Sequence, residues 1–219
     1  MKNILITGAT RGIGKAIKEL LNENAYNCIC PSRKELDVMD IESIMEYFQD
    51  MDQEINGLVN CAGINILSDI ENIDIKDVNS MLNTNLTGPL FLIKEVSKKM
   101  KKNSFGRIVN ISSIWGIRSK EYRTLYSMTK FGINGLTKSL SRELGENNIL
   151  INSIAPGYVN TEMTQQNVPF EEQEKIKKTI PLRRFAEPSE IAELVMFLVS
   201  EKNSYITGEI ITIDGGFLA

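Results

Sequence analysis

The sequence contains no histidine among its 219 residues, and its three cysteines are an odd number. Histidine is the side chain that most often moves protons near neutral pH, so an enzyme built on this chain needs another proton carrier. Without histidine, Cys28, Cys30 and Cys61 are too few ligands for an ordinary zinc site, and we expect no metal. We interpret the cysteines as structural thiols in a reducing compartment.

Long apolar runs and a strong net charge are also missing. No apolar run approaches the ~20 residues that span a bilayer, and the first residues, MKNILITGA, resemble a strand more than a secretory signal. The formal net charge is only −3, which argues against a broad basic surface for nucleic acid. We therefore expect a cytoplasmic protein that binds neither membranes nor nucleic acid.

Short apolar runs alternate with helical patterns along the chain, and no linker rich in Pro, Gly or Ser divides it. The strand-like runs are 4–7, 27–31, 36–38, 57–62, 107–112, 150–156 and 209–215, and the helical patterns lie near 13–24, 41–51, 74–102, 123–147 and 188–200. This alternation predicts one α/β domain over residues 1–219. Its predicted fold is a Rossmann-type doubly wound parallel sheet with helices on both faces.

The connection between the second and third strand-like runs is unusually short. Only Lys34 and Glu35 separate Arg33 from the run 36–38, whereas a helical crossover between parallel strands takes about 10–12 residues. We expect the fold to be shortened here, leaving one side of the sheet less covered.

A glycine-rich loop, TGATRGIG at 7–14, follows the first strand and opens a helix. Glycine permits a tight turn and lets backbone N–H groups approach a pyrophosphate, which the helix N-terminus also attracts. Taken alone, the loop is also compatible with a plain strand–helix turn. Arg11 in the loop, and Ser32 and Arg33 at the second strand end with no carboxylate beside them, favour the 2′-phosphate of NADP(H) over NAD(H). Arg33 as a solvated turn residue is the alternative.

Tyr126 and Lys130 lie four residues apart in the segment TLYSMTK, so a helix would place both on one face. An isolated phenol has a pKa of about 10, and a nearby ammonium lowers it by stabilising the phenolate. The pair alone is weak, because tyrosine and lysine are common on helix surfaces. Upstream, Ser113 ends a strand, where it can donate to a developing alkoxide, and Asn85 can fix a water or a helix carbonyl near Lys130.

Together these segments resemble the short-chain dehydrogenase/reductase family over almost the whole chain. The matching motifs are TGATRGIG, the Asp37–Val38 pair, NCAG at 60–63, APGYVNTEM at 155–163, PLRRFAEPSEIA and YITGEIITIDGG. Cys61 stands where the family has a second asparagine. The resemblance implies a catalytic tetrad of Asn85, Ser113, Tyr126 and Lys130, with Tyr126 as general acid or base.

The resemblance also implies an NAD(P)-dependent oxidoreductase that interconverts carbonyl and alcohol groups. The cofactor contacts that it implies are Gly8, Thr10, Arg11, Gly12, Ile13, Gly14, Ser32, Arg33, Asp37, Val38, Asn60, Ala62, Gly63, Tyr126, Lys130, Pro156, Gly157, Val159 and Thr161. Many members are tetramers, so we expect a homotetramer or a homodimer.

Within the family, the segments NISS, SLSREL and ITGE are most similar to 3-oxoacyl-[acyl-carrier-protein] reductases. Two arginines that are often found in those enzymes fall on Ser104 and Asn147 here, which weakens a carrier-protein substrate. The basic residues that could replace those arginines in attracting an acidic carrier protein are Lys101, Lys102 and Arg107.

Arg118, Lys120 and Arg123 form a second basic group, before Tyr126. These residues either belong to a solvated loop or attract an anionic substrate such as a nucleotide-sugar or an acyl thioester. The polar segment 164–184 is interpreted as a lid over the substrate. A keto-sugar reductase and a non-catalytic NADP(H)-binding regulator remain alternatives.

Overall fold

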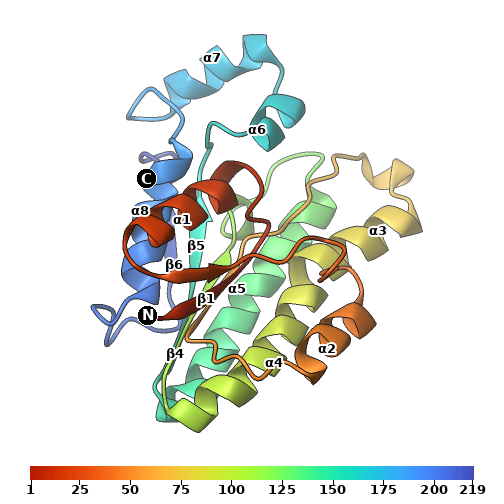
Figure 1. Cartoon of the computed structure of the whole chain (residues 1–219). Helices are drawn as coiled ribbons and strands as arrows, with labels where there is room; N and C mark the ends of the chain where they lie inside the picture. Colours follow the sequence, from red (N-terminus) through yellow and green to blue (C-terminus); the bar gives the residue numbers. More distant parts are fainter.

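A computed structural model describes all 219 residues and is built on one sheet of six parallel strands (Figure 1). The strands are β1 (Asn3–Thr7), β2 (Asn27–Ile29), β3 (Gly57–Asn60), β4 (Gly106–Ile111), β5 (Ile149–Pro156) and β6 (Ile210–Ile213). They lie in the order β2-β1-β3-β4-β5-β6, so the chain reverses direction across the sheet after β2. This arrangement confirms the predicted doubly wound fold.

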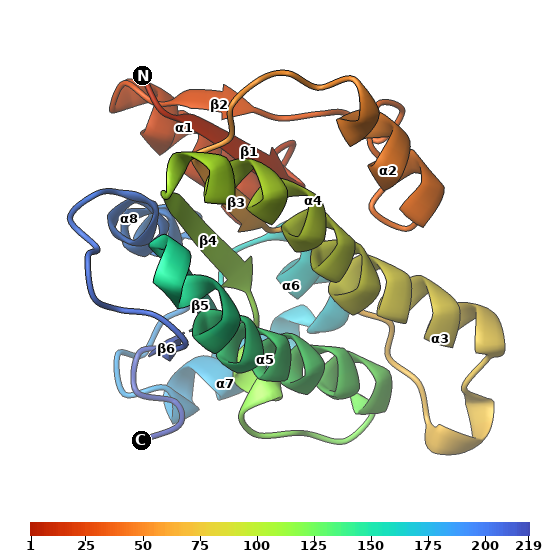
Figure 2. The same cartoon turned by 90° about the horizontal axis from the view of Figure 1, so that it is seen from below.

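Helices cover both faces of the sheet (Figure 2). They are α1 (Gly12–Glu23), α2 (Ile41–Gln49), α3 (Ile75–Leu82), α4 (Gly88–Asn103), α5 (Thr124–Leu144), α6 (Glu162–Asn167), α7 (Phe170–Thr179) and α8 (Pro188–Val199). α1 and α8 pack together over one face, and α2, α4 and α5 contribute to the core on the other. A π-helical turn, Asn83–Thr87, joins α3 to α4.

The alternation of side chains along each strand divides the core into two layers. In β1, Ile4 and Ile6 are buried in the layer beneath α1 and α8, together with Ile17 and Val195. Leu5 is buried in the opposite layer. The central strands are therefore apolar on both faces, as expected of a parallel sheet that helices cover from both sides.

Residues 36–38 form no strand, so the predicted strand there is wrong. The segment instead satisfies its polar groups locally. The Asp37 N–H donates to Ser43 Oγ at 3.0 Å, and Asp37 Oδ1 accepts from the Met39 N–H at 3.0 Å. Leu36 is buried in the layer that contains α2. The chain thus returns from β2 to β3 through α2 alone, and β2 is left as an edge strand, which agrees with the expected shortening.

Arg107 on β4 is buried and is not available at the surface. Its guanidinium donates to the carbonyl oxygens of Asn203 (3.0 Å), Gly106 (2.8 Å) and Asn148 (3.0 Å). The expectation that Arg107 helps to attract an acidic carrier protein is therefore wrong, because its side chain ties the loop after α8 and the turn before β5 to the sheet. None of the helices combines the length and apolarity that a bilayer crossing requires.

Replacing Arg107 with methionine leaves those carbonyl oxygens without their buried donor. We expect Arg107→Met to lower the free energy of unfolding by about 2–3 kcal/mol, measured by urea denaturation. Lys101→Met is the control, because Lys101 is exposed and its replacement should change stability by no more than about 0.5 kcal/mol. Equal stability of the two variants would contradict this account of Arg107.

Candidate functional site

A cavity of about 430 Å³ opens at the carboxyl edge of the sheet. Residues that follow β1, β2, β3, β4 and β5 line it, together with Glu162, Met163, Thr164, Asn167 and Val168 in and just after α6. Open parallel sheets bind ligands outside the carboxyl ends of their strands, near the point where strand order reverses. The lid interpretation of 164–184 agrees with this placement only for its first part, because Thr164, Asn167 and Val168 line the cavity and α7 does not.

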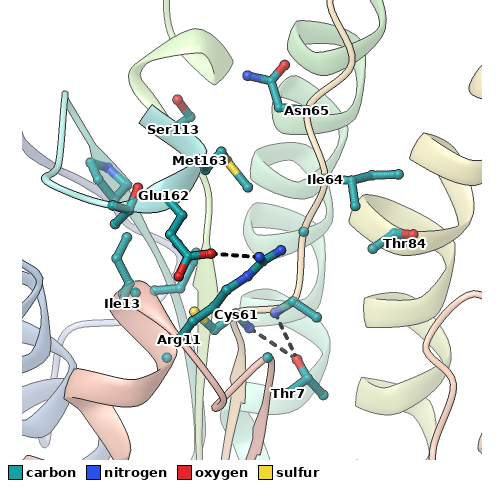
Figure 3. A pocket seen from close by; sticks show the side chains of 18 of the residues that line it. Thr7, Arg11, Ile13, Cys61, Ile64, Asn65, Thr84, Ser113, Glu162 and Met163 are labelled. Carbon is teal, nitrogen blue, oxygen red and sulfur yellow. Dashed lines mark hydrogen bonds and ion pairs between the residues drawn. The ribbon is translucent and has the colours of Figure 1, made fainter. Parts of the chain in front are cut away.

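The glycine loop forms one end of the cavity, and its backbone packing leaves no room for a side chain at Gly8 or Gly14. A Cβ on Gly14 would lie 2.2 Å from the Gly8 carbonyl oxygen. Gly8 itself has a φ of +71°, and a Cβ there would lie 2.8 Å from the Ala62 backbone. Thr7 Oγ1 accepts from the N–H groups of Cys61 and Ala62, each at 3.2 Å, which joins this loop to the turn after β3 (Figure 3).

The polar groups of this cavity suit a dinucleotide. No side chain caps the N-terminus of α1, so the N–H groups of its first turn, which lines the cavity, are available to a pyrophosphate. The buried atoms Asn65 Oδ1 and Thr84 Oγ1 also have no hydrogen-bond partner, and both residues line the cavity. Buried polar atoms are normally paired, so these two are candidates for ligand contacts.

Both arginines predicted to hold a 2′-phosphate are present at the cavity wall, and each is already paired with a carboxylate. Arg11 reaches from the glycine loop to Glu162 of α6 at 2.8 Å (Figure 3). Arg33 pairs with Asp37 at 3.0 Å. These ion pairs are exposed and therefore weak, so an incoming phosphate can compete for the guanidinium groups.

The expectation that no carboxylate lies at the end of β2 is wrong. Glu35 Oε2 accepts from both the N–H and the hydroxyl of Ser32 at 2.7 Å. These two hydrogen bonds lower the pKa of Glu35. The carboxylate therefore occupies the Ser32 donors that a 2′-phosphate would use, and a turn between Ser32 and Glu35 brings it there.

Ser113, Tyr126 and Lys130 converge on the other end of the cavity, and all three are buried. Lys130 Nζ lies 5.4 Å from the centre of the Tyr126 ring and donates to the Ile111 carbonyl oxygen at 2.8 Å. Ser113 Oγ accepts from the Trp115 N–H at 3.2 Å, so the serine is held at the end of β4. The sequence separation of 4 between Tyr126 and Lys130 places both on the inner face of α5, as predicted.

Burial dominates the acid–base properties of this group. It raises the pKa of Tyr126 to about 12, against the lowering effects of a hydrogen bond with Ser113 and of the Arg123 charge. Burial also lowers the pKa of Lys130 to about 8. Among the neighbouring charges, that of Arg123 lowers the Tyr126 pKa in this structure, and the role of Lys130 in stabilising the phenolate stays a prediction.

Asn85 and Asn60 lie behind the cavity wall and do not line it. Asn85 is in the π-helical turn, where its amide exchanges two hydrogen bonds of 2.9 Å with the backbone of Ile64 and donates to Thr129 at 3.2 Å. It thus fixes the chain beside the site. Asn60 donates to Asn110 Oδ1 at 2.8 Å between neighbouring strands.

The other predicted contacts do line the cavity: Gly8, Thr10, Arg11, Gly12, Ile13, Gly14, Ser32, Arg33, Asp37, Val38, Ala62, Gly63, Tyr126, Lys130, Pro156, Gly157, Val159 and Thr161. The structure adds residues that the sequence analysis did not select, notably Trp115, Tyr158 and Glu162. Tyr158 and Glu162 lie within the motif APGYVNTEM, but the sequence does not show that Glu162 pairs with Arg11, because the two residues are 151 positions apart.

Comparison with known proteins finds relatives along almost the whole chain. A family model described as "Enoyl-(Acyl carrier protein) reductase" matches residues 4–218. The chain is 38% identical to the 3-oxoacyl-[acyl-carrier-protein] reductase FabG of Aquifex aeolicus (strain VF5), covering 97% of this chain and 95% of that protein.

Solved structures agree with this similarity. ElxO with NADP bound is 34% identical, with a TM-score of 0.91, 99% of this chain covered and 98% of that chain. 4-Hydroxyisoleucine dehydrogenase complexed with NADH is 28% identical, with a TM-score of 0.94 and the same coverage.

Replacing Gly14 with alanine would push the glycine loop away from its backbone contact. We expect Gly14→Ala to weaken NADPH binding by at least about tenfold, a cost of about 1.4 kcal/mol, measured by fluorescence titration. Gly135→Ala is the matched control, since a Cβ on this helical glycine meets nothing within 4 Å. Unchanged NADPH affinity in Gly14→Ala would show that the loop does not contact the dinucleotide.

Proposed function

The chain belongs to the short-chain dehydrogenase/reductase family, and we propose that it is an NADPH-dependent reductase of 3-oxoacyl compounds. One observation carries this proposal. The glycine loop and the group of Ser113, Tyr126 and Lys130 lie in the same cavity, so a bound dinucleotide and a proton donor can meet there. A sensor that only binds NADP(H) has no need of the second group.

Tyr126 is the proposed proton donor. With a pKa of about 12 it carries its proton at neutral pH, as a general acid requires. Ser113 is the proposed hydrogen-bond donor to the carbonyl oxygen, which fixes its distance from the phenol. Lys130 is the proposed cation that stabilises the phenolate after proton transfer, and Asn85 positions the Ile64 backbone beside it.

Hydride transfer is the chemistry that the nicotinamide supplies when it is bound. The carbonyl carbon gains the hydride, and the carbonyl oxygen gains the Tyr126 proton. A ketone, NADPH and a proton therefore give a secondary alcohol and NADP⁺, with Tyr126 reprotonated from solvent. The protein's own contribution is to orient the carbonyl and to hold one proton at the phenol oxygen.

The proposed cofactor preference rests on Arg11 and Arg33. Both line the cavity, and both guanidinium groups are exposed beside their present carboxylate partners. A relative of this fold, ElxO, has been solved with NADP, while 4-hydroxyisoleucine dehydrogenase has been solved with NADH. NAD(H) is accordingly the less favoured cofactor. The feature of this chain that opposes NADP(H) is the Glu35 carboxylate, which accepts hydrogen bonds from the Ser32 N–H and hydroxyl.

The proposed substrate class follows from the curated relative, a 3-oxoacyl-[acyl-carrier-protein] reductase. The carrier protein itself has less support, because Ser104 and Asn147 replace basic residues and Arg107 is buried. Lys101 and Lys102 remain exposed at the end of α4. A keto-sugar is the competing substrate, and a screen of NADPH oxidation decides between the two.

We further propose a homotetramer or homodimer in the cytoplasm. Met128 and Phe131 on α5 and Leu90 on α4 are large apolar side chains exposed in the single chain, as subunit interfaces often provide. The three cysteines are free thiols, in keeping with a reducing compartment.

Removing the Tyr126 hydroxyl tests the proposed reaction. We expect Tyr126→Phe to lower kcat for acetoacetyl thioester reduction by about 10²–10⁴-fold, the usual contribution of a general acid, while NADPH binding stays near the wild-type affinity. Tyr205→Phe is the control, because Tyr205 is 95% exposed. Crotonyl thioester, which offers a C=C bond beside its thioester, distinguishes this activity from an enoyl reductase. Near wild-type turnover by Tyr126→Phe would refute the role of this residue.

Reversing the charge at position 33 tests the cofactor preference. We expect Arg33→Asp to shift the NADPH-to-NADH ratio of kcat/KM towards NADH by about tenfold or more, because one charge-assisted contact to the 2′-phosphate is lost. Lys34→Asp makes the same charge change at the neighbouring exposed position and should leave the ratio nearly unchanged. If both variants shift the ratio equally, the effect is one of general charge and not of a contact from Arg33.

A further inference from the structure

Three arginines line the cavity, and only Arg123 has no carboxylate partner. Arg11 and Arg33 are exposed and paired with Glu162 and Asp37, at 2.8 and 3.0 Å. The side chain of Arg123 makes neither an ion pair nor a hydrogen bond in the structure, although the residue is only 6% exposed. The structure thus separates Arg123 from Arg118 and Lys120, which are exposed on the preceding loop.

The surroundings of Arg123 are aromatic and neutral. Its guanidinium lies 5.5 Å from the centre of the Trp115 ring. The ionisable groups that its charge influences most are the phenols of Tyr126 and Tyr158, and it lowers the pKa of each against the raising effect of burial. Asp37 and Glu162 are the only acidic residues that line the cavity, and both are paired with other arginines. The guanidinium nitrogens are not among the fully buried polar atoms that lack a partner, so they stay accessible from the cavity that Arg123 lines. A largely buried charge in such a place favours an anionic partner.

The chain directs this side chain inward. Arg123 is the residue immediately before α5, and it makes no side-chain cap to that helix. Tyr122 before it has a φ of +63°, which is uncommon for a bulky residue. The Tyr122 carbonyl oxygen accepts from the Ser68 N–H at 3.3 Å, so the turn is anchored to another loop beside the site.

We propose that Arg123 binds an anionic group of the substrate, and that this group is the C1 carboxylate of a 3-oxo acid. The inference rests on the proposed reduction of a carbonyl at Tyr126 and narrows the substrate class of that site. Arg123 directly precedes α5, both Arg123 and Tyr126 line the cavity, and the Arg123 charge is near enough to lower the Tyr126 pKa. A carbonyl held by Tyr126 and Ser113 thus leaves a carboxylate two carbons away within reach of the guanidinium. A neutral thioester at C1 would leave the buried charge without its counter-ion.

A phosphate of the dinucleotide is a less suitable partner for Arg123. The glycine loop and the uncapped start of α1 supply the phosphate donors at the opposite end of the cavity. Arg123 instead lies over the Trp115 ring, beside Ser113 and Tyr126, where the reacting carbonyl is expected. The cofactor affinity of an Arg123 variant separates these two roles.

The test compares acetoacetate with its neutral methyl ester and with acetoacetyl-N-acetylcysteamine. The wild-type kcat/KM for acetoacetate should exceed that for the methyl ester by about tenfold or more, as a charge-assisted pair would give. Arg123→Gln should lower kcat/KM for acetoacetate by about 10–100-fold and that for the ester much less. Any effect of Arg123 on the Tyr126 pKa acts on both substrates, so it cancels in the ratio of kcat/KM for acetoacetate to kcat/KM for the methyl ester. Arg118→Gln is the matched control on the exposed loop and should keep the wild-type ratio.

A second measurement does not depend on turnover. Butanoate, which has the carboxylate but no carbonyl to reduce, should bind the wild-type enzyme–NADPH complex in a fluorescence titration and should not bind the Arg123→Gln complex. Arg123→Lys keeps the charge without the planar fork, so it should retain weaker butanoate binding, and it serves if Arg123→Gln does not fold.

Several results would overturn the inference. They are a wild-type preference for the thioester or the ester, an equal loss on acid and ester in Arg123→Gln, butanoate binding that survives the substitution, and a weakened NADPH affinity with an unchanged substrate ratio. A thioester preference would still support the proposed reductase. If the enzyme reduces none of the three substrates, the proposed function is refuted. The butanoate titration alone would then show whether Arg123 binds a carboxylate.

Discussion

The parallel direction of all six strands brings their carboxyl ends to a single edge of the sheet, and the site depends on this one constraint. The glycine loop after β1, the turn after β3 and Ser113 after β4 meet there because the strands end there. The two buried layers of side chains fix the strands in register, so the positions of these loops follow from the core. α5 then adds Tyr126 and Lys130 from the side, because its inner face packs against β5 and the segment after β4.

Close backbone packing makes the cofactor end of the cavity rigid. The Gly8 carbonyl excludes a side chain at Gly14, and the Ala62 backbone excludes one at Gly8. Thr7 holds the turn after β3 against the same loop through two hydrogen bonds. This geometry leaves the first N–H groups of α1 directed at the cavity without an internal partner, which is how helix N-termini receive anions.

Burial, more than any single neighbour, sets the electrostatics at the opposite end. Removing Tyr126 and Lys130 from water disfavours the charged form of each, so the tyrosine keeps its proton and the lysine pKa is lowered towards neutrality. Arg123 adds a positive charge in the same space without a carboxylate to balance it. A region with buried cations and a neutral phenol is suited to a substrate that brings negative charge, either as a carboxylate or as an oxygen that becomes negative in the reaction.

Alternation of strand and helix, the glycine spacing and the order of Asn85, Ser113, Tyr126 and Lys130 are local properties. The amino-acid sequence was therefore enough to predict the fold class, most element boundaries and most of the cavity wall. It failed where the outcome depends on distant partners or on local polar satisfaction. Residues 36–38 are apolar enough for a strand, yet Asp37 bonds with Ser43 and Met39 and the segment stays irregular. Arg107 and Arg123 are indistinguishable from surface arginines in the sequence. The folded chain shows that Arg107 binds backbone carbonyls and that Arg123 lies unpaired in the cavity. The difference arises on folding, because burial and pairing are set by residues far apart in the chain.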